Sequence, residues 1–154
     1  MRRRLLLRGS LMSLLAAAAS SRAEDRWMLV TPEEVKMSRE APPVSEMRGL
    51  PVPGAPEIVV EQPDAAKPLL HAPLTIRVHF VPGVGAAIDP NSFKASYGSL
   101  GLDITNRLLQ HAKLSGGVLS MENVDIPSGL HTVTLTIADN AGRKGTRTFR
   151  FTVG

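Results

Sequence analysis

The chain of 154 residues contains no cysteine, and aromatic residues make up only 4% of it. Without cysteine it cannot form disulfides, thiolate metal sites, a cysteine nucleophile or a lipid-modified lipobox cysteine. No apolar run reaches the roughly 20 residues that cross a bilayer, so no membrane anchor is expected. Neither a G-x-S-x-G elbow nor a paired-carboxylate spacing occurs. We therefore expect a protein that is not an enzyme.

Acidic residues are absent from the first 23 positions, which hold five of the 18 Lys and Arg residues. An arginine-rich start precedes the short apolar stretch 11–19, and small residues follow where a signal peptidase reads them. These features predict a signal peptide, residues 1–23, cleaved after Ala23. Arg3 and Arg4 also resemble the twin-arginine consensus, so both Sec and twin-arginine export stay open. The product is expected in the periplasm, or outside a cell that lacks an outer membrane.

The charge balance changes once this leader is removed. The remaining chain has 13 Lys and Arg against 14 Asp and Glu, so the isoelectric point near 10.0 belongs to the leader. A nearly neutral product lacks the basic surface that nucleic acid requires. We expect no nucleic-acid partner.

Residues 24–56 contain six prolines and few β-branched residues. Such a segment buries too little apolar surface to offset its ordering entropy. It is interpreted as a Pro-rich flexible arm. Thr31-Pro32-Glu33-Glu34 has a capping hydroxyl, an N-terminal proline and a glutamate three residues on, which predicts a short helix over 31–39.

Residues 57–154 show short apolar–polar alternations separated by Gly and Pro turns. The pattern predicts an all-β fold, an immunoglobulin-like antiparallel β-sandwich of about seven strands. The expected core residues are Ile76, Val78, Phe80, Phe93, Val133, Leu135, Ile137, Phe149, Phe151 and Val153.

The segment 129–142, GLHTVTLTIADNAG, followed by TFRFTV at 148–153, resembles bacterial immunoglobulin-like domains. These domains often read G-x-H-x-V-x-V-x-V-x-D-x-A-G and end in a phenylalanine-rich strand. The segment 101–105, GLDIT, is similar to their G-x-D-V-T segment. The resemblance covers residues 57–154 and implies the fold. It does not select a function, because such domains serve adhesion, spacing, carbohydrate contact and enzyme accessory roles.

The chain also resembles periplasmic copper carriers in its size and its C-terminal strand. In that family, histidines at the mature N-terminus and in a D-G-H turn bind Cu(II). Here the corresponding positions hold Glu24 and the turn 139–143, and the four histidines have no i, i+2 or i, i+4 spacing. Asp139 is better explained by an Asx turn in which Gly142 adopts positive φ than by a calcium site. We expect no metal and no cofactor.

Two groups of residues are candidates for partner binding. The arm concentrates Trp27, Met28 and Leu29, and tryptophan is enriched in binding hot spots. The competing interpretation is that Trp27 folds back over an open edge of the sandwich. The second group lies on the outer face of the last hairpin: Thr132, Thr134, Thr136, Thr148, Arg150 and Thr152, with Lys94 and Ser96 from another strand. Threonine also suits any solvated strand.

The leading hypothesis is an exported, non-catalytic interaction module of the cell envelope that binds a protein partner. The alternative is a carbohydrate or cell-wall contact module that serves a separate enzyme. Sugar-binding faces usually present aromatic rings, and the predicted domain leaves none exposed, which disfavours it. A periplasmic metal carrier is the third possibility.

Overall fold

The computed structural model describes residues 26–42, 52–64 and 66–154. The predicted signal peptide, its cleavage site after Ala23 and residues 43–51 lie outside the described part. No helix in that part is long and apolar enough to cross a membrane.

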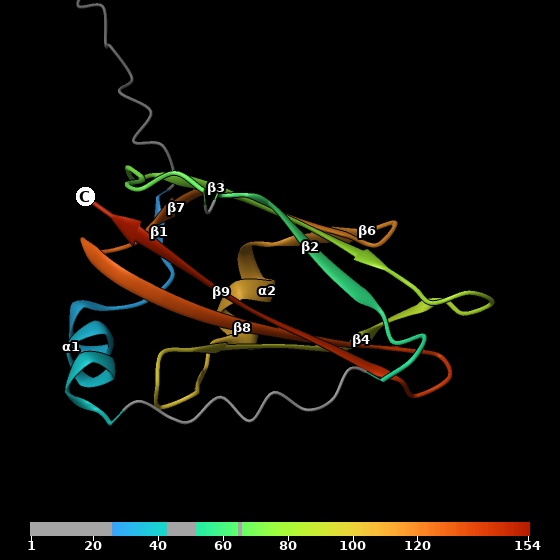
Figure 1. Ribbon diagram of the computed structural model, residues 1–154. Coiled ribbons are helices and arrows are strands. Elements are labelled where there is room, and N and C mark those ends of the chain that lie inside the picture. Colours follow the sequence, from blue (N-terminus) through green and yellow to red (C-terminus); the bar gives the residue numbers. More distant parts are fainter. Residues whose placement is uncertain (1–25, 43–51, 65) are drawn as a thin grey trace, which may run out of the picture.

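The protein is a β-sandwich of two packed sheets (Figure 1). Sheet A has the order β1 (Trp27–Met28), β7 (Val118–Asp125), β3 (Leu74–Val81) and β2 (Glu57–Gln62), and β6 (Lys113–Ser115) also pairs with β7. Sheet B has the order β5 (Leu102–Asp103), β4 (Ile88–Tyr97), β8 (Gly129–Asp139) and β9 (Lys144–Val153). These strands pair antiparallel, except that β1 runs parallel to β7.

Among the described residues, two helices accompany the sheets. The first, α1 (Pro32–Glu40), begins at the predicted capping box: Glu34 N donates to Thr31 Oγ1, and Thr31 N donates to Glu34 Oε2 at 2.8 Å. It lies within one residue of the range expected from sequence. The second, α2 (Thr105–His111), follows β5 and buries Leu108.

The core between the sheets contains all ten residues that the alternation predicted, each at most 8% exposed. They alternate along β3, β8 and β9 with exposed or half-buried neighbours. Because the period of a strand is two residues, this alternation sends one face of each sheet inward and the other to solvent. The all-β fold prediction is confirmed.

The prediction that residues 24–56 form an arm outside the domain is wrong for residues 26–42, here called the N-terminal segment. Leu29, Val30 and Val35 are buried with at most 4% of their surface exposed. Burying each such side chain contributes about 1.5–3 kcal/mol. The segment has few apolar residues, but these three enter the core, and β1 extends sheet A. The N-terminal segment is therefore held to the domain by the position of its few apolar side chains, despite its low apolar content.

Candidate functional site

The arm residues predicted to bind a partner belong mostly to the fold. Trp27 is half-buried, its ring stacks on His111 with centroids 4.3 Å apart, and its Nε1 donates to the carbonyl of Glu122. Leu29 is 2% exposed, and Met28 is 48% exposed. The partner-docking prediction is therefore wrong for Trp27 and Leu29. The structure shows Trp27 folded back against the β7 edge.

The N-terminal segment is also held through α1. Arg107 Nη1 and Nη2 donate to the two oxygens of the Glu34 carboxylate, at 2.8 and 2.9 Å, and Nη1 also donates to the carbonyl of Leu29. The hydrogen bonds from Arg107 hold the pKa of Glu34 below its ordinary value. Ser99 binds Ser38 through two further hydrogen bonds. Residues 26–42 are thus part of the folded domain. Nothing in the local sequence pattern indicated that Arg107 would bind this segment.

The outer face of sheet B brings the other predicted residues together. Ser96 on β4 lies opposite Thr134 on β8, which lies opposite Thr148 on β9; Lys94, Thr136 and Thr146 form the next row. Thr132 faces Arg150 across the same two strands. We call the following residues the threonine face: Lys94, Ser96, Thr132, Thr134, Thr136, Thr146, Thr148, Arg150 and Thr152.

Hydrogen bonds between threonines order this face. The Oγ1 atoms of Thr134 and Thr148 lie 2.9 Å apart, and those of Thr136 and Thr146 lie 3.1 Å apart. Each hydroxyl has one donor and two acceptor lone pairs, so one bond per pair leaves a donor and several lone pairs for a partner. Threonine is stiff at χ1, and little side-chain entropy remains to be lost on binding. The arrangement suits hydrogen-bonded recognition.

Charge is unevenly distributed around the face. Lys144 lies on the outer side of β9 opposite Ala138, and Arg147 lies opposite the buried Leu135, on the core-facing side. Arg147 is nevertheless exposed because β9 is the edge strand of sheet B. At the opposite margin, Asp103 faces Ser96, and its hydrogen bonds with Thr105 lower its pKa, with a smaller contribution from Lys94. Cations thus lie along β9, and this carboxylate lies across the sheet.

Two buried polar side chains are already occupied by hydrogen bonds. His131 Nε2 faces the carbonyl of Pro127 at 2.7 Å and so donates to it, which leaves Nδ1 to accept from the Tyr97 hydroxyl at 2.8 Å. Burial lowers the pKa of His131. Asp139 accepts from the backbone of Ala141 and Arg143 and from Arg143 Nε. Burial opposes its ionisation, but these bonds prevail and lower the pKa of Asp139.

The turn after β8 has the predicted form. The Asp139 carboxylate closes an Asx-type turn, and Gly142 has φ +76°, a left-handed conformation that glycine adopts without a Cβ penalty.

Across residues 26–42, 52–64 and 66–154, no group of three or more His, Cys, Asp or Glu side chains converges to hold a metal ion. His79 pairs with Glu61 at 3.2 Å on the outer face of sheet A.

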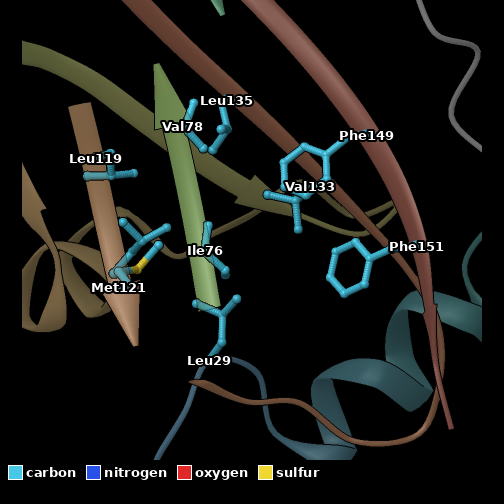
Figure 2. A pocket seen from close by; sticks show the side chains of 10 residues that line it. Leu29, Ile76, Val78, Leu119, Met121, Val133, Leu135, Phe149 and Phe151 are labelled. Atoms are coloured by element: carbon cyan, nitrogen blue, oxygen red, sulfur yellow. The ribbon is translucent and has the colours of Figure 1, made fainter. Parts of the chain in front are cut away.

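A cavity of about 10 Å³ lies between the sheets, lined only by apolar side chains that include Leu29, Met121 and Phe151 (Figure 2). A space of this size holds at most about one water molecule, and an apolar lining keeps it dry. It is a packing defect of the core and has no room for a ligand.

No protein-family model matches the sequence, and no curated protein matches it. Among solved structures, the crystal structure of CopC from Methylosinus trichosporium OB3b is similar, at 18% sequence identity and a TM-score of 0.38. The match covers 57% of this chain and 85% of that chain. A likeness of this size does not carry a ligand or a function from one protein to the other.

Proposed function

We propose that this protein is an exported, non-catalytic interaction module of the cell envelope, an immunoglobulin-like sandwich that binds a protein partner through the threonine face. The observation that carries the proposal is the pair of cross-strand hydroxyl contacts, Thr134 with Thr148 and Thr136 with Thr146. They order polar side chains on an exposed sheet face. The predicted signal peptide supports export.

The composition of the face favours a protein over a sugar polymer. Sugar rings are commonly held by stacking on aromatic side chains, and the threonine face contains none. Among the described residues, the one tryptophan has a ring face covered by His111. Leu130, 60% exposed and opposite Thr152, adds an apolar contact near Arg150. An apolar anchor beside arginine and hydroxyl groups is typical of protein interfaces.

The buried polar groups support a non-catalytic protein. His131 and Asp139 are the buried polar residues in the described part of the chain, and both are bonded to structural partners. A general base needs a free nitrogen or oxygen within reach of a substrate proton. Neither residue offers one, since His131 uses both ring nitrogens inside the core.

The test compares capture of a partner from envelope extract by two triple variants of the chain from residue 24 onward. The first, Thr134→Ala, Thr136→Ala and Thr148→Ala, removes hydroxyls from the threonine face. The control, Thr75→Ala, Arg77→Ala and Ser120→Ala, alters the outer face of sheet A. We expect a partner captured by the wild type to be lost with the first variant and retained with the control. Retention by both variants would reject the proposal, provided that circular dichroism shows both to be folded.

A further inference from the structure

Two short segments at one end of the sandwich contain no charged residue. Residues 52–56, which precede β2, read VPGAP, and residues 81–87, from the end of β3 to β4, read VPGVGAA. We call them the apolar loops. They protrude at the end where the turn from β8 to β9 also lies (Figure 1). Val84 is 101% exposed, Val52 is 51% exposed and Val81 is 46% exposed. Exposed apolar residues that cluster in this way mark an interaction site.

The apolar loops touch each other and are fixed by the turn between β8 and β9. A Cβ on Gly83 would collide with the carbonyl of Gly54, so the two loops meet through their backbones. The guanidinium of Arg143 lies beside both glycines. Ala87 N donates to Asn140 Oδ1 at 3.1 Å, and Asn140 N donates to the carbonyl of Ala87 at 2.9 Å. The loops therefore have a defined arrangement.

Each apolar loop contains a hydrogen-bonded β-turn. In the turns 52–55 and 83–86, the amide of the fourth residue donates to the carbonyl of the first at 3.0 Å. The glycine at the third position of each turn has positive φ, +74° and +72°, as a type II turn requires. Pro53 and Val84 thus occupy the same corner position of two adjacent turns. Because the turns are already ordered, little conformational entropy is lost when they bind.

We infer that the apolar loops are a second contact for the protein partner, and that Pro53 and Val84 enter an apolar pocket on its surface. This inference rests on the proposed function and names the chemistry of the partner at a further contact. The threonine face continues to this end, because the pair Thr136–Thr146 is followed by the pair Ala138–Lys144 and then by the turn that fixes the loops. One partner can therefore cover both surfaces.

A second copy of the chain fits the apolar loops poorly. Within the described part of the chain, the cavity between the sheets has a volume of about 10 Å³, which is too small for a valine side chain. Contact between the loops of two copies would involve only a few residues on each side. A stable interface buries about 800 Å² per partner, from about 20–30 residues. The occupant is therefore a different protein.

A lipid bilayer also fits poorly. The strands that begin beside the loops start with charges of opposite sign, Glu57 on β2 and Lys144 on β9. An anionic membrane attracts a local excess of Lys and Arg, which this pair does not provide. The closing bond of the turn 83–86 does not use the peptide group between Val84 and Gly85. Hydrocarbon cannot hydrogen-bond such a group, whereas a protein pocket can.

The test uses the partner captured through the threonine face, identified and purified, and measures its affinity for the chain from residue 24 onward by calorimetry. We expect Val84→Ser to weaken binding about tenfold, as loss of one buried valine contact predicts, and Val84→Asp to weaken it further. The matched controls Val59→Ser and Val59→Asp alter a valine on the outer face of sheet A, 37% exposed, and should leave the affinity nearly unchanged. Equal melting midpoints check that the variants are folded.

Photo-cross-linking tests the contact directly. With benzoylphenylalanine in place of Val84, we expect a cross-link to apolar residues of the purified partner. The same replacement at Val59 should give none. Flotation with vesicles of phosphatidylethanolamine and phosphatidylglycerol, and ultracentrifugation of the chain alone, test lipid and a second copy as occupants.

Unchanged affinity in both Val84 variants would overturn the inference, and so would equal losses in the Val59 variants. Vesicle binding or dimerisation that Val84→Asp abolishes, with partner affinity intact, would also overturn it. If the triple threonine variant loses the partner while Val84→Asp does not, this inference fails and the proposed function stands. If only Val84→Asp loses the partner, the threonine face is rejected and the apolar loops remain as the contact. If no protein is captured, both fail.

Discussion

His131 is a buried, neutral side chain, and its neighbours determine which of its two ring nitrogens carries the proton. The carbonyl of Pro127 requires a proton on Nε2, and the Tyr97 hydroxyl then donates to Nδ1. A second proton on the ring would have to displace the Tyr97 donor inside the core. Burial and the nearby positive charge of Arg39 therefore hold the pKa of His131 below its ordinary value of 6.5.

This lowered pKa predicts that stability falls in mild acid. Below about pH 6.5 the unfolded chain takes up a proton that the folded chain resists, so the free energy of unfolding decreases as pH falls from 6.5 toward the folded pKa. Above pH 6.5 the contribution is fully present. Urea unfolding between about pH 7.5 and 5 should show this slope. It should flatten in His131→Gln and persist in His79→Gln, and identical slopes in wild type and His131→Gln would contradict the assignment.

For single residues, the sequence predicted the roles that depend on residues nearby in the sequence. The Asx turn at Asp139 and the positive φ of Gly142 follow from a motif of four residues. The roles of Tyr97 and Pro127 toward His131 could not be predicted, because Tyr97 lies on a different strand and its contact depends on the pairing of β4 with β8. Alternation indicates that a side chain points inward, but it does not indicate what it meets there.

At the scale of elements, α1 is joined to α2 through the bidentate contact of Arg107 with Glu34. Replacing Arg107 with alanine would leave the half-buried Glu34 carboxylate without its main partner. Removing one member of such a pair lowers the free energy of unfolding by about 1–3 kcal/mol, because the other member loses its hydrogen bonds. We expect Arg107→Ala to lower the free energy of unfolding by that amount, measured in urea. Lys36→Ala, which removes an exposed i, i+4 pair with Glu40, should cost less than about 0.5 kcal/mol.

The strand β1 offers a second test of the N-terminal segment. Trp27 packs against the core and stacks on His111, whereas Met28, the next residue, is largely exposed. We expect Trp27→Ala to lower the free energy of unfolding by about 1–3 kcal/mol. This is at or below the lower end of the range for a fully buried tryptophan, because Trp27 is only half-buried. Met28→Ala should cost less than about 0.5 kcal/mol. The wild-type tryptophan emission should be blue-shifted in the isolated protein. An unshifted emission with an unchanged melting midpoint for Trp27→Ala would show that the segment is not docked in solution.

The elements that the sequence predicted are those with strong local patterns. Alternation identified β3, β8 and β9 with their core faces, and the capping box identified α1. The docking of α1 was missed because its contacts join residues far apart, such as Glu34 with Arg107, 73 positions away. The threonine face was predicted as a set of outward residues. Which of these residues lie opposite one another depends on the register of β4, β8 and β9, and alternation alone does not determine that register.

For the whole molecule, stability comes from one apolar core that spans both sheets and the N-terminal segment. No cluster of metal-ligating side chains was found among the described residues. We expect the same melting midpoint in EDTA, in calcium and in Cu(II) at micromolar concentration. A rise of several degrees with either ion would show binding to the folded state, because a ligand stabilises the state that binds it. That result would contradict the expectation that no metal is needed.

The docking of the N-terminal segment has a consequence for the order in which the chain folds. Trp27 contacts Glu122, 95 residues later, and Arg39 contacts Ser128, 89 residues later. These contacts of the N-terminal segment therefore cannot form until the later residues have been synthesised. At the other end, Leu70 pairs with Val153, the penultimate residue. Contacts of such long sequence separation slow folding, since the loops they close must be ordered before the contact forms. Until β9 has been synthesised, β8 and Leu70 lack the strand with which they pair, so we expect the two sheets to complete their core only after that point.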